Sequence, residues 1–120
     1  MTVKNKQDDL LEQHFRGKQQ MRPVFEELVR TIRSLDRKTK IIAHDSHIDL
    51  ELKAQFGLVR VRKHSVELGL HLPDTPWEDR YRDATALNLG RITHLARLAT
   101  EKDVDVALRK DIKRAMAASR

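Results

Sequence analysis

A chain of 120 residues has the length of one ordinary domain, and we expect a single domain over residues 1–120, with residues 1–18 as an N-terminal helical arm and residues 19–120 as the core. The absence of Cys excludes disulfides and thiolate metal sites, and no run approaches the roughly 18 apolar residues of a membrane span, so we expect a cytoplasmic protein without a membrane partner. Lys and Arg number 24 against 18 acidic residues, and the resulting net charge of +6 favours encounters with polyanions.

Two helices are predicted before the first strand. Asp8 or Asp9 can cap a short helix that ends near Gly17. A second helix begins around Pro23, because proline is tolerated in a first helical turn. Its apolar residues recur at helical spacing and form one stripe: Met21, Phe25, Leu28, Val29, Ile32 and Leu35. Such a stripe requires an apolar sheet face to cover.

Alternation of apolar and polar residues predicts that face as an antiparallel meander of four strands, over 40–44, 47–53, 56–62 and 65–72. Two-residue turns at 54–55 and 63–64 would pair Leu50 with Val59, and Val59 with Leu68. One side of the meander is then continuously apolar. The other side carries a polar row in which Arg60 lies beside both Asp49 and Glu67, and whose members are His47, Asp49, Glu51, Arg60 and Glu67.

The remainder of the chain is predicted to complete one sheet edge and to add a last helix. A capping signature at Thr75 predicts a short helical turn that bears Trp77 and Tyr81. Residues 91–99 fit both helical spacing and the alternation of an edge strand, so their pattern leaves both structures open. A second capping signature, which begins at Thr100, predicts a helix with the buried stripe Val104, Leu108, Ile112, Ala115 and Met116.

Several short segments spread over nearly the whole chain carry a resemblance to a known family. They are Gly17 and Lys18, residues 48–50, Phe56 and Gly57, Arg62 and Lys63, residues 68–72, residues 94–98, and Val104 and Asp105. Together they resemble the bacterial family catalogued as domain of unknown function 5655. The resemblance implies a strand over 91–99 and no established activity. The chain departs from the family at His64, where a turn often has Gly, and at Met116, where a Tyr is usual.

We therefore expect an α+β fold. It would contain two N-terminal helices, an antiparallel meander of four strands with a fifth strand, and a C-terminal helix, with the helices packed on one sheet face.

Basic residues mark two candidate anion-binding surfaces. Arg62 and Lys63 cluster at a hairpin tip, and the last helix carries Arg109, Lys110, Lys113 and Arg114. Such groups can contact phosphates without reading bases, although basic helix faces are also common on ordinary proteins.

Catalytic and metal sites are less well supported by the sequence. Glu51, Leu52 and Lys53 form the acid, spacer and base triplet of metal-dependent nucleases. Such a nuclease also needs a second acid on a neighbouring strand, whereas the candidate Asp49 shares the strand of Glu51. His44 and His47 flank a turn, whereas His71 is separated from His47 by a strand, and zinc requires three or four converging ligands. We therefore expect no metal and no cofactor.

These observations together predict a non-enzymatic binding or interaction module that binds anions or nucleic acid weakly. A module for protein–protein interaction is the alternative, through the polar sheet face or an edge strand. A nuclease-like enzyme at Asp49, Glu51 and Lys53 is the third hypothesis.

Overall fold

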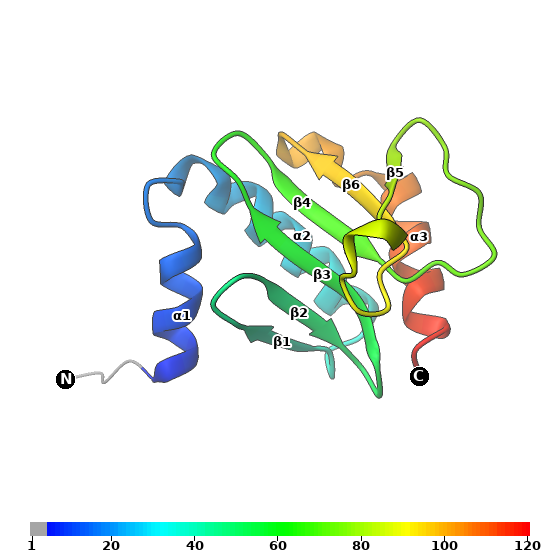
Figure 1. Ribbon diagram of the computed structural model, residues 1–120. Coiled ribbons are helices and arrows are strands. Elements are labelled where there is room, and N and C mark those ends of the chain that lie inside the picture. Colours follow the sequence, from blue (N-terminus) through cyan, green and yellow to red (C-terminus); the bar gives the residue numbers. More distant parts are fainter. Residues whose placement is uncertain (1–4) are drawn as a thin grey trace.

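The computed structural model describes residues 5–120 as an antiparallel sheet of six strands with three α-helices (Figure 1). The strands are β1 (Lys40–Ala43), β2 (Ile48–Glu51), β3 (Gln55–Val61), β4 (Val66–Leu70), β5 (Tyr81–Asp83) and β6 (His94–Leu98), in the spatial order β1-β2-β3-β4-β6-β5. The helices are α1 (Lys6–His14), α2 (Arg22–Leu35) and α3 (Val106–Ala117), with single 3₁₀ turns at η1 (Gln19–Met21), η2 (Thr85–Leu87) and η3 (Glu101–Asp103). The predicted α+β class is confirmed, with one strand more than expected.

One face of the sheet is covered by α2 and α3, which lie behind it in Figure 1. The sheet contributes Ile48, Val59 and Leu68, all fully buried, so the predicted alternation of faces is confirmed. The helices contribute the buried residues Val24, Phe25, Leu28 and Ile32 from α2, and Leu108, Ile112, Ala115 and Met116 from α3. Burying each Val, Leu, Ile, Phe or Met side chain of this core stabilises the fold by about 1.5–3 kcal/mol. Among residues 5–120, no helix combines the length and the apolar character that crossing a membrane requires.

The first helix begins earlier than predicted. Asn5 is its cap, because the Asn5 Oδ1 accepts a hydrogen bond of 2.8 Å from the backbone N–H of Asp8. Asp8 and Asp9 instead lie in the first turn, where their charges favour the positive end of the helix dipole. The helix ends before Gly17, whose φ of +73° reverses the chain, as predicted.

Helix α1 also covers the outer edge of the sheet. The Gln7 side chain donates to the carbonyl of Ala43 at 3.1 Å and accepts from the N–H of Ala43 at 2.8 Å. A glutamine amide thus takes the place of a neighbouring strand at this point of β1, which reduces the capacity of that edge to pair with another chain.

The register between β3 and β4 is confirmed, with Val59 opposite Leu68. The register between β2 and β3 was predicted wrongly by two residues, because the connection occupies residues 52–54 and the ladder is irregular after Leu50. Leu50 consequently pairs with Gly57, and Asp49 pairs with Leu58 instead of Arg60. A shift of two residues preserves side-chain parity, which is why the faces are right although the pairs are not.

The helical turn predicted around Trp77 is wrong. Residues 75–80 form turns and irregular chain, and Tyr81 opens β5, opposite Ala96 of β6. The Trp77 indole stacks on His94 with ring centroids 5.1 Å apart and donates to the Thr93 carbonyl at 2.9 Å. The capping pattern failed because these contacts, and a free strand edge on β6, compete successfully with one short turn of helix. The strand predicted over 91–99 is confirmed as β6.

A second, smaller core lies on the other face of the sheet, which the sequence pattern assigned entirely to solvent. The segment between β5 and β6 folds over this face, in front of the sheet in Figure 1, and buries Leu58, Ala84, Ile92 and Leu95. The polar surface is therefore restricted to the part of the face that this segment leaves uncovered.

Helix α3 is capped by Asp105, whose carboxylate accepts from the N–H of Leu108 at 2.9 Å and pairs with Arg80 through both oxygens. The capping signature beginning at Thr100 instead caps η3. The hydrogen bonds from Arg80 first, and from Leu108 second, lower the pKa of Asp105 to about 2.

Replacing Asp105 by Asn is expected to remove the ion pair and keep the cap, because Asn caps helices nearly as well as Asp. A lowered pKa stabilises the fold above the ordinary value of 3.8, and that contribution is lost as the pH falls toward about 2. Since the Asp105 side chain is 41% exposed, we expect a difference of only about 1 kcal/mol at neutral pH, shrinking toward zero near pH 2. Urea unfolding across this pH range measures it, with Asp79→Asn as the exposed control; a difference independent of pH would contradict the assignment.

Candidate functional site

The uncovered part of the open sheet face carries four arginines around one buried carboxylate. We call Arg60, Arg62, Arg82 and Arg97 the arginine cluster. Its centre is Glu67, which is only 8% exposed.

Three members of the cluster pair directly with Glu67. The Nε atoms of Arg60 and Arg62 lie 3.1 and 3.0 Å from its Oε1, and the Nη2 of Arg82 lies 3.4 Å from its Oε2. Arg97 stands directly opposite Glu67 in the register between β4 and β6 and donates from Nε to the Ser65 hydroxyl at 3.3 Å. One carboxylate is thus shared among several guanidinium groups.

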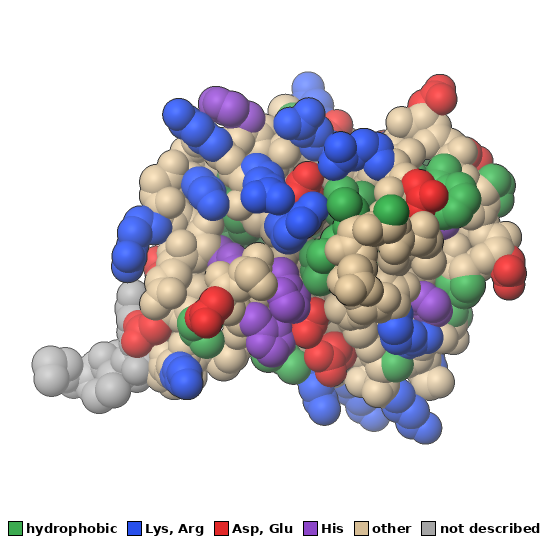
Figure 2. Space-filling model, in the orientation of Figure 1, with side chains coloured by type: hydrophobic (Ala, Val, Ile, Leu, Met, Phe, Trp, Pro, Cys, Tyr) green, Lys and Arg blue, Asp and Glu red, His purple; other side chains and the backbone are tan. Residues whose placement is uncertain are grey.

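Strand parity explains why these side chains meet. Arg60 and Glu67 are opposite each other on β3 and β4, Arg62 follows Arg60 by two residues, and Arg97 lies on β6 at the same level. Arg82 points to this face from β5, the outermost strand. Figure 2 shows Lys and Arg side chains gathered on this side of the molecule around an acidic one, with His side chains beside them.

The charge of this surface is unbalanced. Three guanidinium groups pair with one carboxylate, and Arg97 stands opposite it on β6, so the five side chains carry a net charge of +3. Arg60 and Arg62 reach Glu67 through Nε, so these bonds do not use the paired Nη groups that hold phosphates or carboxylates in bidentate fashion. The Arg62 and Arg82 side chains are 53% and 73% exposed, which makes them accessible to a ligand.

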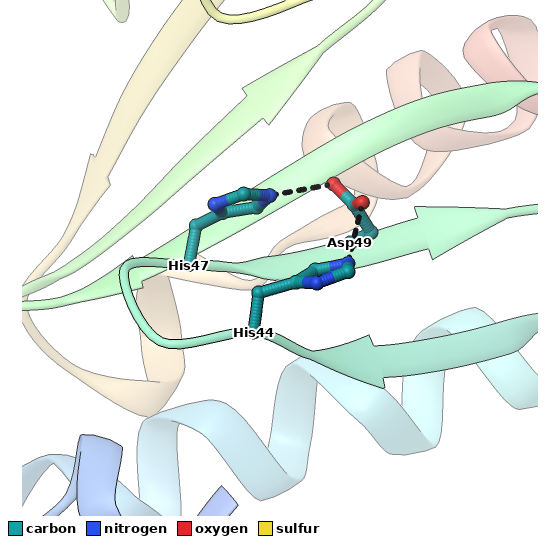
Figure 3. Close-up of side chains that lie close together, drawn as sticks. All are labelled: His44, His47 and Asp49. Carbon is teal, nitrogen blue, oxygen red and sulfur yellow. Dashed lines mark hydrogen bonds and ion pairs between the residues drawn. The ribbon is translucent and has the colours of Figure 1, made fainter. Parts of the chain in front are cut away.

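A second polar group adjoins the arginine cluster at the β1–β2 hairpin (Figure 3). The Nε2 atoms of His44 and His47 lie 3.0 and 3.2 Å from different oxygens of Asp49. Gln55 holds the same carboxylate, because its Nε2 donates to Oδ1 at 2.8 Å. Ile48 of β2 pairs with Val59 of β3, so His47, which precedes Ile48, lies beside Arg60, which follows Val59.

The structure separates the two basic surfaces predicted from the sequence. Arg62 joins the arginine cluster, and Lys63 lies at the adjoining turn, where its carbonyl accepts from Gln20. The basic face of α3 belongs to the helical layer behind the sheet, as Figure 1 shows. Its residues contact other helices or loops: Arg109 bonds Ser34 and Arg114 bonds Thr75, with Lys110 and Lys113 on the same helix.

The three residues of the nuclease hypothesis also separate. Asp49 and Glu51 remain on β2, but the strand ends at Glu51 and Lys53 lies in the following turn. There Lys53 lines a shallow hollow with Asp36 and Arg120. The spacing of acid and base along one strand is therefore not realised.

Arg82 and Arg97 were missed by the sequence analysis. Arg97 could have been found, because it alternates with Ala96 and Leu98, which belong to the main core, once that strand is paired with β4. Arg82 could not, because it follows Tyr81 in a segment whose pattern indicated a helical turn.

Comparison with known families gives a match over residues 11–119 to the family described as Domain of unknown function (DUF5655). Neither the curated proteins nor the solved structures contain a match to the chain. Because the matched residues extend over almost the entire sequence, the chain belongs to the DUF5655 family.

Proposed function

We propose that this protein is a binding module for phosphate-rich polyanions, nucleic acid first among them, and that the arginine cluster is its contact surface. The observation that carries the proposal is the sharing of one buried carboxylate, Glu67, among several arginines. A single carboxylate orients the guanidinium groups without neutralising them. The remaining positive charge is then available to an anion.

The expected binding is weak and independent of base sequence. Arginine contacts to phosphates release condensed counterions, so the affinity should fall steeply as salt concentration rises. The face near the cluster exposes no row of aromatic side chains among the described residues, since Trp77 stacks on His94. We therefore expect contacts with phosphates and no stacking of bases.

The test is fluorescence anisotropy with a labelled oligonucleotide over a series of salt concentrations. The double variant Arg62→Glu/Arg82→Glu is expected to lower the affinity by about tenfold or more, and to flatten the logarithmic dependence on salt by about two contacts. These two arginines are the most exposed of those paired with Glu67, so the double variant tests the surface with least disturbance of the sheet.

The matched control is Lys110→Glu/Lys113→Glu, which changes the net charge equally but lies on α3. The control should retain most of the affinity. Equal losses in the two double variants would show that binding follows net charge alone, and a loss confined to the control would place the contact surface on the helix. Binding that does not change with salt would contradict the proposal altogether.

The other two hypotheses have less support from the geometry. Pairing of another strand with β1 is opposed by Gln7, which already bonds Ala43 at that edge. A nuclease centre at Asp49, Glu51 and Lys53 is opposed by the displacement of Lys53 into a turn.

A further inference from the structure

Two imidazoles and one carboxylate converge at the β1–β2 hairpin, and neither the family nor the proposed polyanion surface gives them a role. His44 and His47 flank the turn, with the N–H of His44 bonded to the carbonyl of His47 at 2.8 Å. Asp49 follows His47 by two residues and so projects from the same face of the sheet. The potential ligand atoms of the three side chains all lie within 4.8 Å of one another.

We infer that His44, His47 and Asp49 form a binding site for a divalent transition-metal ion, with Zn²⁺ as the representative case. Ligand atoms about 2.0–2.1 Å from a tetrahedral zinc ion lie about 3.4 Å from each other. The observed distances of 3.0 and 3.2 Å between the imidazole nitrogens and the carboxylate oxygens are close to that spacing. The remaining pair, the two imidazole nitrogens, lies within 4.8 Å, so rotation of the side chains would bring all three ligands around one ion.

The chemistry of the donors selects the ion. Imidazole nitrogen suits Zn²⁺, Co²⁺, Ni²⁺ and Cu²⁺, whereas Mg²⁺ and Ca²⁺ prefer sites built from oxygen alone. Three protein ligands leave at least one coordination position for water or for an anion. His44 is 47% exposed and His47 is 28% exposed, so that position would face solvent.

Neighbouring groups support the same assignment. A metal ion takes the lone pair of Nε2, so each neutral imidazole must then carry its proton on Nδ1. The Nδ1 of His47 lies 3.0 Å from the Ser46 hydroxyl, which can accept that proton in a hydrogen bond. Gln55 fixes the Asp49 carboxylate by donating from Nε2 to Oδ1 at 2.8 Å. Partners of this kind orient ligands in metal sites.

The first experiment uses the untagged protein with Co²⁺, followed by competition with Zn²⁺. We expect a d–d absorption band that saturates at about one equivalent of Co²⁺ and disappears when Zn²⁺ is added, with no competition from Mg²⁺. Nitrogen NMR of the histidine side chains in the same protein should show Zn²⁺-dependent shifts at Nε2 of His44 and His47. These two measurements need no variant to fold.

The second experiment removes ligands one at a time. His44→Gln and Asp49→Asn should each weaken Zn²⁺ binding by about tenfold or more in calorimetry. His64→Gln and Asp45→Asn are the matched controls, because each removes the same type of side chain from a nearby turn without removing a ligand. Both controls should bind as the parent does.

Three results would overturn the inference: no binding of Co²⁺ or Zn²⁺ by the parent, equal weakening in ligand and control variants, or shifts at histidines other than His44 and His47. The metal site and the polyanion surface are distinguishable, because Arg62→Glu/Arg82→Glu changes no proposed metal ligand. That variant should bind Zn²⁺ as the parent does, whichever way the polyanion test falls.

Discussion

Replacing Glu67 by Gln is expected to lower the free energy of unfolding by about 2 kcal/mol while raising the affinity for polyanions. The two effects have one cause. Glu67 is the single negative charge among four guanidinium groups, so its neutralisation raises the local charge from +3 to +4.

The loss of stability follows from the pairs that Glu67 makes. Hydrogen bonds to charged partners contribute about 1.5–3 kcal/mol each when buried, but Arg62 and Arg82 are more than half exposed and can rehydrate. Only Arg60, 22% exposed, remains largely enclosed beside the uncharged amide. The expected total is therefore close to the value of one buried pair, and urea unfolding measures it.

The gain in affinity should be about threefold at low salt and should vanish at high salt, where charges on the surface are screened. Glu78→Gln is the control, since it makes the same change in net charge at an exposed position outside the cluster. A fall in the affinity of the Glu67 variant would mean that orientation of the arginines matters more than their charge. An unchanged free energy of unfolding would mean that the three ion pairs contribute nothing net.

The sequence predicted best those strands in which apolar and polar residues alternate over several successive positions. Ile48, Val59 and Leu68 alternate with polar neighbours on three successive strands, and each reached the core. Parity survived even where the β2–β3 turn was assigned one residue too short, because the resulting slip was an even number of residues. The predicted pairing of Asp49 with Arg60 was wrong, because the identity of a cross-strand partner depends on the length of the turn as well as on side-chain parity.

The elements that pattern missed depend on contacts between distant segments. Ile92 could not be assigned to a second core without knowing that residues 84–93 fold back over β4. Arg82 likewise reaches Glu67 only because Tyr81 opens an edge strand beside β6. The arginine cluster therefore combines Arg60 and Arg62, which lie with Glu67 in the predicted meander, with Arg82 and Arg97, which β5 and β6 add.

The proposed metal site depends on a spacing of residues that is already visible in the sequence. His71, the third histidine weighed as a ligand from the sequence, follows β4 and is separated from the hairpin by β3. The spacing His44, His47 and Asp49 already places two residues on either side of a hairpin and the third on the same face. A carboxylate two residues along the strand was the nearer candidate.

Replacing Gly69 by Val is expected to destabilise the fold by about 3 kcal/mol, at the upper end of the usual cost of adding methyl groups to a packed site. Gly69 lies on β4 beneath the second core, and a Cβ atom at this position would lie 2.6 Å from Cγ2 of Ile92. Ile92 is only 2% exposed, and its branched side chain cannot move aside without lifting the segment between β5 and β6. Relative to the parent, the variant should therefore show a larger increase in the rate of hydrogen exchange in residues 84–93 than in α2.

A double-mutant cycle with Ile92→Ala separates this clash from a general weakening of β4. Ile92→Ala alone should cost about 2–4 kcal/mol because it opens a cavity, but it also makes room for the valine, so the double variant should cost less than the two single changes combined.

Gly17→Ala provides the contrast: its backbone φ of +73° makes a side chain costly although nothing lies within 4 Å of the added Cβ. Its cost should add to that of Ile92→Ala without coupling. Additivity at Gly69 as well would show that the second core does not rest on β4 through this contact.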